Sequence, residues 1–200
     1  MTVATLPRPP RKRCAGIRAL VLALALLVVI GDAGAETRAF LLRGWFGVFS
    51  SGIDAMAADL SRRGIRAEAI GHLEWKSAAE RIVRERAAGG ATRIALVGHS
   101  QGANNIIDMA RELEKHGIRV DLLVTLAPFL QDPVPPNVLR AVNYYQSPGW
   151  GTALSAGPGF AGELRNVDIG SDGGTFHVTI DKNAGVQARV IESIVALTVR

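Results

Sequence analysis

The chain has 200 residues, of which 48% are hydrophobic and 20% charged. This length suits one domain with a core of its own and is short for two. The formal net charge is +5, but residues 1–35 hold five basic residues and one acidic residue, so that residues 36–200 carry only +1. A nearly neutral domain lacks the strongly basic surface of nucleic-acid-binding proteins, and we expect no nucleic-acid partner.

Residues 1–35 have the three-part order of a secretory signal. Five Lys and Arg residues precede the apolar run 19–30, and the small residues Ala33 and Ala35 follow it. We therefore expect residues 1–35 to be a signal peptide, the protein to be periplasmic or secreted, and residues 36–200 to be a single domain. The alternative is an uncleaved segment that anchors the protein to a membrane, although the apolar run is shorter than the roughly 20 residues of a typical span.

The sequence contains none of the common motifs of metal sites and cofactor sites. Cys14 is the only cysteine and lies within the expected signal, so the mature domain has neither a disulfide nor a thiol nucleophile. The sequence contains no CxxC motif, no HExxH motif and no His/Asp cluster at metal-ligand spacing. We expect neither a metal nor a cofactor.

From residue 39 onward, apolar runs of strand type alternate with segments of helical spacing. The expected strands are 39–44, 65–70, 92–98, 119–127, 140–146 and 163–169, and the expected helices are 52–64, 75–90, 102–117 and 185–197. This alternation predicts an α/β fold with a mostly parallel sheet of about six strands and helices on both faces. Ligand chemistry in such sheets collects at the carboxyl ends of the strands, where the irregular stretches 128–137 and 147–162 also fall.

The stretch 98–102, Gly-His-Ser-Gln-Gly, fits the G-x-S-x-G pattern of a nucleophile elbow. It directly follows an expected buried strand and opens an expected helix, which is the setting that the motif requires. The pattern predicts that Ser100 is lifted above the sheet as a nucleophile, while the N–H of Gln101 faces the developing oxyanion. We expect a second oxyanion donor from the backbone of Trp45 or Phe46, in the loop after the first strand.

A serine nucleophile needs a base, and His177 is the candidate. It lies between the last strand and the last helix, where this architecture places its base. His72 precedes the serine in the sequence, and His116 belongs to the last turn of a helix. His99 lies inside the elbow, where we expect its ring to point away from the reacting side.

The acid that would orient this histidine is less clearly marked. Residues 146–162 contain no Asp or Glu. Asp132 follows the strand after the elbow and is the first choice for the acid, and Asp168, close to His177 in sequence, is the second.

Together, the elbow GHSQGA, the loop RGWFG after the first strand and a late histidine resemble the α/β-hydrolase superfamily in a compact version that lacks the first two strands. More narrowly, the segments VPPNV, NYYQS, GPGF, NVDI and FHVTID are similar to small exported bacterial lipase-like or thioesterase-like hydrolases. The likeness covers most of residues 38–183. Members of this group often carry Asp-Pro at the end of the strand after the elbow, whereas this chain has Ala127-Pro128.

These features predict an exported serine hydrolase that cleaves small-molecule esters or thioesters through an acyl-enzyme on Ser100. The loop 147–162 would border the acyl pocket. An acyltransferase would share all of these parts. The alternative is a catalytically idle protein of the cell envelope with the same fold, which binds a ligand or an envelope partner. Ala127 and the absence of carboxylates from 146–162 favour it.

Overall fold

The computed structural model describes residues 36–90, 92–149, 151–170 and 174–199. The expected signal segment, residues 1–35, lies outside these residues. The sheet consists of β1 (Glu36–Leu42), β2 (Arg66–Ile70), β3 (Thr92–His99), β4 (Leu122–Leu126), β5 (Arg140–Tyr145) and β6 (Glu163–Asp168). The helices are α2 (Ser51–Arg62), α3 (Trp75–Ala87), α4 (Gln101–Lys115) and α5 (Ala184–Thr198), with short 3₁₀ turns η2 (His72–Glu74) and η3 (Ile180–Lys182).

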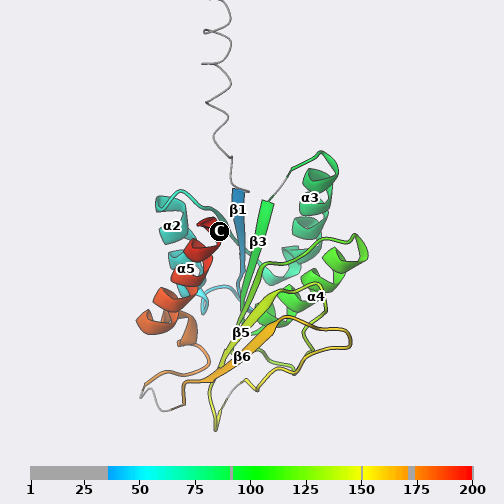
Figure 1. Cartoon of the computed structure of the whole chain (residues 1–200). Coiled ribbons are helices and arrows are strands. Elements are labelled where there is room, and N and C mark those ends of the chain that lie inside the picture. The colour runs from blue at the N-terminus through cyan, green and yellow to red at the C-terminus, as the bar shows by residue number, and fades with distance from the viewer. Residues whose placement is uncertain (1–35, 91, 150, 171–173, 200) are drawn as a thin grey trace, which may run out of the picture. The chain divides into compact units, whose positions relative to one another are not determined.

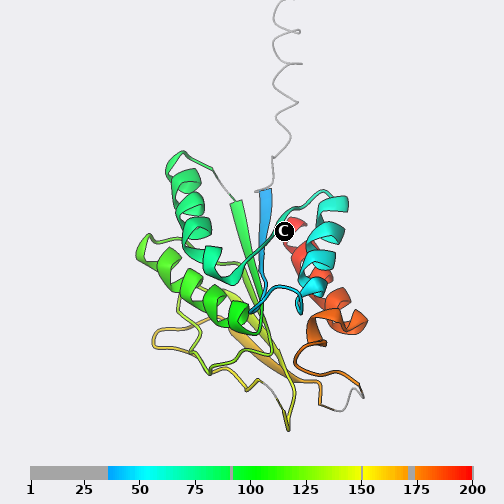
Figure 2. The same ribbon diagram turned by 180° about the vertical axis from the view of Figure 1, so that it is seen from behind.

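The six strands form one sheet in the order β2-β1-β3-β4-β5-β6, and every neighbouring pair is parallel. Helices α2 and α5 cover one face, whereas α3 and α4 cover the other (Figures 1 and 2). The expected α/β class, the number of strands and the helices on both faces are confirmed.

Both faces of the central strands are buried, because each face packs against a helical layer. In β3, Ala95 and Val97 pack into the core on the α2/α5 side, while Ile94 and Leu96 pack into the core on the α3/α4 side. Side chains alternate between the two faces of a strand, so that burial on both faces requires a nearly continuous apolar run. This is why residues 94–97 contain no polar side chain.

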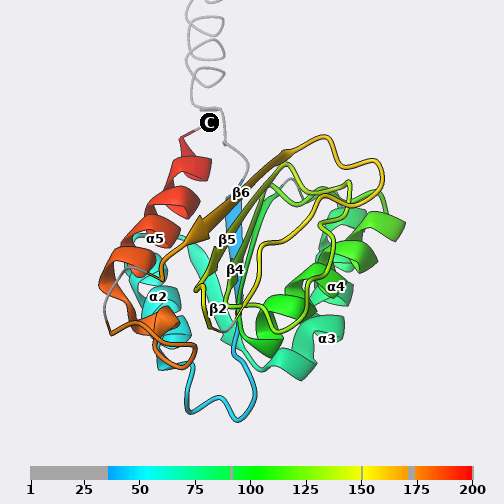
Figure 3. The ribbon, with the colours of Figure 1, turned by 90° about the horizontal axis from the view of Figure 1, so that it is seen from below.

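The strand order reverses between β1 and β3, since the chain runs from β1 outward to β2 and then returns past β1 to β3. Ligand sites of parallel sheets form at such a switch point, beyond the carboxyl ends of the strands. Figure 3 shows the sheet from this end, with α2 and α5 on one side and α3 and α4 on the other. The segments after β1 and β3 both emerge here.

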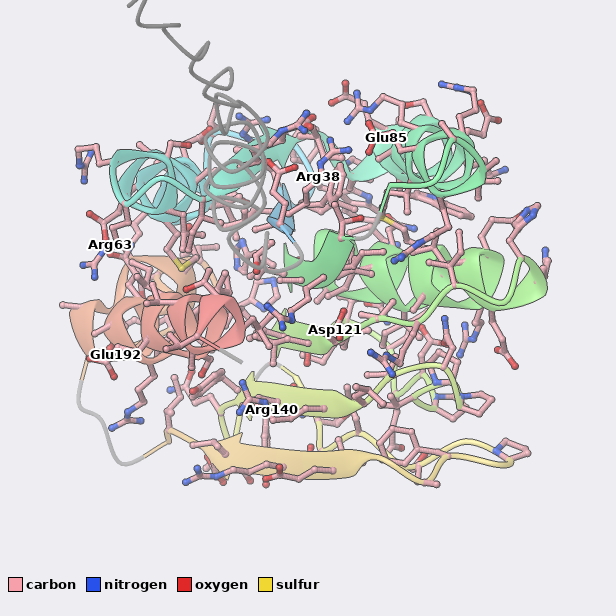
Figure 4. The ribbon with its side chains drawn as sticks, turned by 45° about the horizontal axis from the view of Figure 1, so that its top comes forward. Arg38, Arg63, Glu85, Asp121, Arg140 and Glu192 are labelled. Atoms are coloured by element: carbon pink, nitrogen blue, oxygen red, sulfur yellow. The ribbon has the colours of Figure 1, made fainter. Side chains whose placement is uncertain are left out.

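The opposite end of the sheet carries charged groups. Arg38 at the start of β1 is 4% exposed and pairs with Glu85 and, at 2.9 Å, with Glu68. Asp121 and Arg140 lie near the starts of β4 and β5 (Figure 4). Among the helices that the structure describes, none is both long enough and apolar enough to cross a bilayer.

Candidate active site

Ser100 stands at the corner between β3 and α4 with φ 56° and ψ −122°, a backbone conformation that is strained for a residue with a side chain. The two glycines of the motif make the corner possible. A Cβ at Gly98 would lie 2.3 Å from the carbonyl oxygen of Gly102, and a Cβ at Gly102 would lie 2.5 Å from that of Leu42. Neither position has room for a larger residue, and the tight corner holds Ser100 above the end of the sheet.

The hydroxyl of Ser100 contacts His177. Their Oγ and Nε2 atoms are 2.8 Å apart, although the two residues are 77 positions apart in the sequence. A short turn presents His177, because the N–H of Phe176 donates to Oγ1 of Thr179 at 2.8 Å. Burial lowers the pKa of His177 below its ordinary value of 6.5, the neighbouring His99 lowers it further, and the negative charge of Asp181 opposes both effects. The imidazole therefore stays neutral at neutral pH, as a general base must.

The loop between β1 and α2 also lies next to Ser100. Gly44 lies so near that a Cβ there would be 3.0 Å from Cβ of Ser100. The N–H of Gly44 donates to Oγ of Ser50 at 2.9 Å, which folds residues 44–50 into a compact turn. Trp45 and Phe46, the expected oxyanion donors, follow directly and line the cavity in front of Ser100. Gln101 begins α4, so its N–H has no acceptor within the helix.

His99 does not point away from the reacting side, and this expectation was wrong. His99 is among the residues that line the same cavity as Ser100, and its ring lies beside the ring of His177, with 5.4 Å between the centroids. The Nε2 atom of His99 bonds to the carbonyl oxygen of His177 at 2.7 Å, and Nδ1 lies 2.8 Å from Oγ of Ser50. Periodicity gives the face of a strand but not the direction of a ring at the strand's last residue, which depends on local twist.

Asp181 and Lys182, in η3, also join the loops around the site, although no sequence pattern singled them out. Asp181 is fully buried, and its Oδ2 accepts a hydrogen bond from the N–H of Gly52 at 2.8 Å. The ammonium of Lys182 donates to the carbonyl oxygens of Phe49 and Val178 at 2.7 and 2.6 Å. The segment after β1 and the segment that follows His177 are thus joined by hydrogen bonds from both of these side chains.

The two carboxylates considered for the acid are bound elsewhere in the fold. Oδ2 of Asp132 accepts from the amide of Asn104 at 2.8 Å, and Oδ1 lies 3.6 Å from the guanidinium of Arg111, both on α4. Asp168 ends β6, where its Oδ1 accepts from the N–H groups of Ser147 and Gly170. The contacts that the structure describes for these carboxylates are not to the ring of His177.

Ala127, which the resemblance marks as a position where an aspartate was expected, is completely buried. A Cβ at Gly151 would lie 3.0 Å from Cα of Ala127, so the loop after β5 packs tightly on this position. The described part of 147–162 is held along β5 and β6. There Asn143 donates to the carbonyl of Thr152, and Asn166 accepts from the N–H of Leu154.

A cavity of about 240 Å³ opens in front of Ser100. Its apolar lining consists of Trp45, Phe46, Phe49, Phe129 and Val178. The rings of Trp45 and Phe129 lie 6.2 Å apart and are each about half exposed, at 54% and 50%. Among the described residues, the lining comes from the loops after β1 and β4, from the elbow and from the loop of His177, and none of it comes from 147–162. The geometry offers a nucleophile, a base and an apolar cavity.

Neither a protein-family model nor a curated protein sequence matches the chain. Solved structures do. The type II thioesterase BorB from the borrelidin biosynthetic cluster has a TM-score of 0.57 and 13% identity, over 80% of this chain and 91% of that one. Est1E from Butyrivibrio proteoclasticus has a TM-score of 0.54 and 12% identity, over 84% and 91%. The RedJ thioesterase of the prodiginine pathway in Streptomyces coelicolor has a TM-score of 0.53 and 10% identity, over 83% and 91%.

At these identities the likeness establishes the fold alone. The chain has the α/β-hydrolase fold, as the elbow, the loop after the first strand and the late histidine predicted. Of the three neighbours named above, BorB and RedJ are thioesterases.

Proposed function

We propose that this protein is an exported serine hydrolase that cleaves carboxylic esters or thioesters of small molecules, with Ser100 as the nucleophile and His177 as its base. The observation that carries the proposal is the 2.8 Å contact between Oγ of Ser100 and Nε2 of His177 at a strained corner. The strained backbone of Ser100 also supports a catalytic role for this residue, because the surrounding structure must hold an energetically costly conformation in place.

The reaction would run in two halves. In the first, Oγ of Ser100 attacks the acyl carbon while Nε2 of His177 takes the hydroxyl proton. The negative oxygen of the tetrahedral intermediate would accept hydrogen bonds from the N–H of Gln101 and from the backbone of Trp45 or Phe46. His177 then returns the proton to the departing alcohol or thiol. In the second half, water attacks the acyl-serine with the same base and restores Ser100.

The cavity supports an apolar acyl group as the part of the substrate that is recognised. Aromatic rings from the loops after β1 and β4 form its walls, and the same loops and the loop of His177 carry further exposed apolar side chains next to lining residues in the sequence: Val48, Leu130 and Phe176. Apolar walls with a few polar groups at one end are typical of small-molecule sites. An acyltransferase would use the same residues with an alcohol or amine in place of water.

The test is hydrolysis of a panel of activated esters and thioesters by the purified protein, together with labelling by a fluorophosphonate. Wild type should hydrolyse at least one substrate class and bind the label, and Ser100→Ala should do neither while unfolding at the same temperature. A wild-type protein that resists the label and leaves the whole panel intact would support the idle, ligand-binding alternative.

Export is proposed from the residue pattern of 1–35 alone. Protein recovered from the periplasm or the medium should begin at or near Glu36 by mass spectrometry. An intact N-terminus in the membrane fraction would support the anchored alternative.

A further inference from the structure

One unbroken chain of hydrogen bonds runs through the core between the two loops that flank Ser100. It begins at the N–H of Gly44, which donates to Oγ of Ser50. It continues from Ser50 to Nδ1 of His99 and ends where Nε2 of His99 meets the carbonyl oxygen of His177. Ser50 is 0% exposed and His99 is 2% exposed, so water does not compete for these contacts.

The direction of each bond follows from the chemistry of the groups. A carbonyl oxygen only accepts, and Nε2 of His99 must therefore carry the proton and donate to His177. Burial lowers the pKa of His99, so the ring is neutral and Nδ1 is an acceptor. The hydroxyl of Ser50 then donates to Nδ1, which leaves its lone pairs to accept from the N–H of Gly44. Every donor in this series of hydrogen bonds, from Gly44 to His177, has one acceptor.

We propose that Ser50 and His99 are positioning residues that set the loop after β1 and the backbone of His177 jointly with respect to Ser100. This inference rests on the proposed function, in which the first element carries an oxyanion donor and the second carries the base. Ser50 bonds to the loop that contains Trp45, and His99 bonds to the backbone that carries the base. One buried imidazole therefore sets the distance between the two halves of the catalytic site.

The same two loops have a second connection, through Lys182. Its ammonium bonds to the carbonyl oxygens of Phe49 and Val178, and its side chain is 38% exposed. Because this connection is independent of the imidazole, we expect variants at Ser50 and His99 to fold with both loops in place but less sharply fixed. A displacement of about 1 Å in a catalytic group is sufficient to lower a rate by about 100-fold.

A first measurement does not depend on activity. Long-range proton–nitrogen NMR of the full-length protein should show His99 as the neutral Nε2–H form with an unprotonated Nδ1. Ser50→Ala should shift the imidazole signals of His177, although Ser50 makes its bond to His99 and not to His177. The matched control is Thr125→Val, which removes another fully buried hydroxyl, bonded to Asn143 in the adjacent strand. Signals of His177 that stay in place in Ser50→Ala would overturn the proposal, whether or not the protein hydrolyses esters.

A second measurement compares rates of fluorophosphonate labelling and ester hydrolysis per folded molecule. Ser50→Ala and His99→Gln should each lower kcat/KM by roughly 10- to 100-fold, mostly in kcat, and Thr125→Val should leave it within twofold. Both variants interrupt the same series of hydrogen bonds, so the double variant should be about as slow as the slower single variant. Losses that multiply in the double variant, or a fall in melting temperature with unchanged kcat, would show independent structural roles and overturn the proposal.

The failure of the proposed function has a different signature from the failure of this inference. A wild-type protein without hydrolysis or labelling would refute the proposed hydrolase, and the NMR shifts of His177 would then still show whether Ser50 and His99 position the backbone of His177.

If Ser50→Ala does not fold, His99→Gln answers the same question, because the amide nitrogen of the glutamine replaces the Nε2 donor but the side chain does not replace Nδ1 as the acceptor for Ser50. Exchange of the Gly44 amide with solvent should then become faster than in wild type, and an unchanged rate would overturn the proposal.

Discussion

The carboxylate of Asp181 accepts a hydrogen bond from the backbone N–H of Gly52, with 2.8 Å between the two atoms and 129 positions of sequence between the residues. Gly52 lies in the first turn of α2, directly after the loop that flanks Ser100. Asp181 lies in η3, directly after the loop of His177. This single bond therefore joins the bases of the two loops that form the site.

Removing that carboxylate should destabilise the protein. Asp181→Ala leaves the N–H of Gly52 buried without an acceptor, which costs about 1–3 kcal/mol of unfolding free energy. Asp181→Asn keeps an acceptor oxygen and should cost less. Urea unfolding of both variants measures the difference, and equal losses would mean that the bond to Gly52 contributes nothing.

Asp181→Asn should also change the pH dependence of the reaction. Burial lowers the pKa of His177, and the negative charge of Asp181 acts in the opposite direction. Without that charge the pKa of His177 falls further, and the acid limb of kcat/KM against pH should move to lower pH. A limb that moves to higher pH would contradict the electrostatic role of Asp181.

In the wild-type protein, kcat/KM should rise with pH and reach half of its plateau below pH 6.5, the ordinary pKa of histidine. The base must be neutral, and a lowered pKa keeps it neutral to lower pH. Stability should fall as the pH is lowered through the same range, because the unfolded chain binds protons near the ordinary pKa of histidine while burial lowers the pKa of His99 and His177 in the folded protein. Stability that increases on acidification through this range would contradict burial of the rings.

Asp132→Asn separates the two roles open to this carboxylate. Its bonds to Asn104 and Arg111 on α4 lead us to expect a loss of about 1 kcal/mol in stability and less than about tenfold in turnover. A triad acid would cost on the order of 10⁴ in kcat. Asp168→Asn is the matched comparison, since Asp168 binds backbone N–H groups at the end of β6. A 10⁴-fold loss in either variant would identify that residue as the acid.

Trp45→Ala should reduce the preference for longer acyl chains. The indole lines the cavity beside Phe129, and its loss removes apolar contact from the acyl group. Each methylene of the substrate buried there contributes about 0.8 kcal/mol, so butyrate esters should lose several-fold more kcat/KM than acetate esters. Leu73→Ala is the control, because Leu73 is 79% exposed on η2 and does not line the cavity. An equal loss for both esters would place the acyl group elsewhere.

The order of strands and helices, the elbow at Ser100 and the choice of His177 follow from the sequence alone. Apolar periodicity is a local property that sets which face of each element is buried, and G-x-S-x-G is contiguous. The sequence also predicted that the loop after β1 would approach Ser100, because the carboxyl ends of parallel strands share one edge. These features depend on short stretches of chain and on the general rules of parallel sheets.

Tertiary structure decided the partners of the polar groups. The direction of the His99 ring, its bonds to Ser50 and to the backbone of His177, and the bond from Gly52 to Asp181 join residues 49 to 129 positions apart. It also directed Asp132 toward α4, although its position after a strand suited the acid equally well. A hydrogen bond depends on tenths of an ångström and on angle, and those are fixed only when the loops pack against one another.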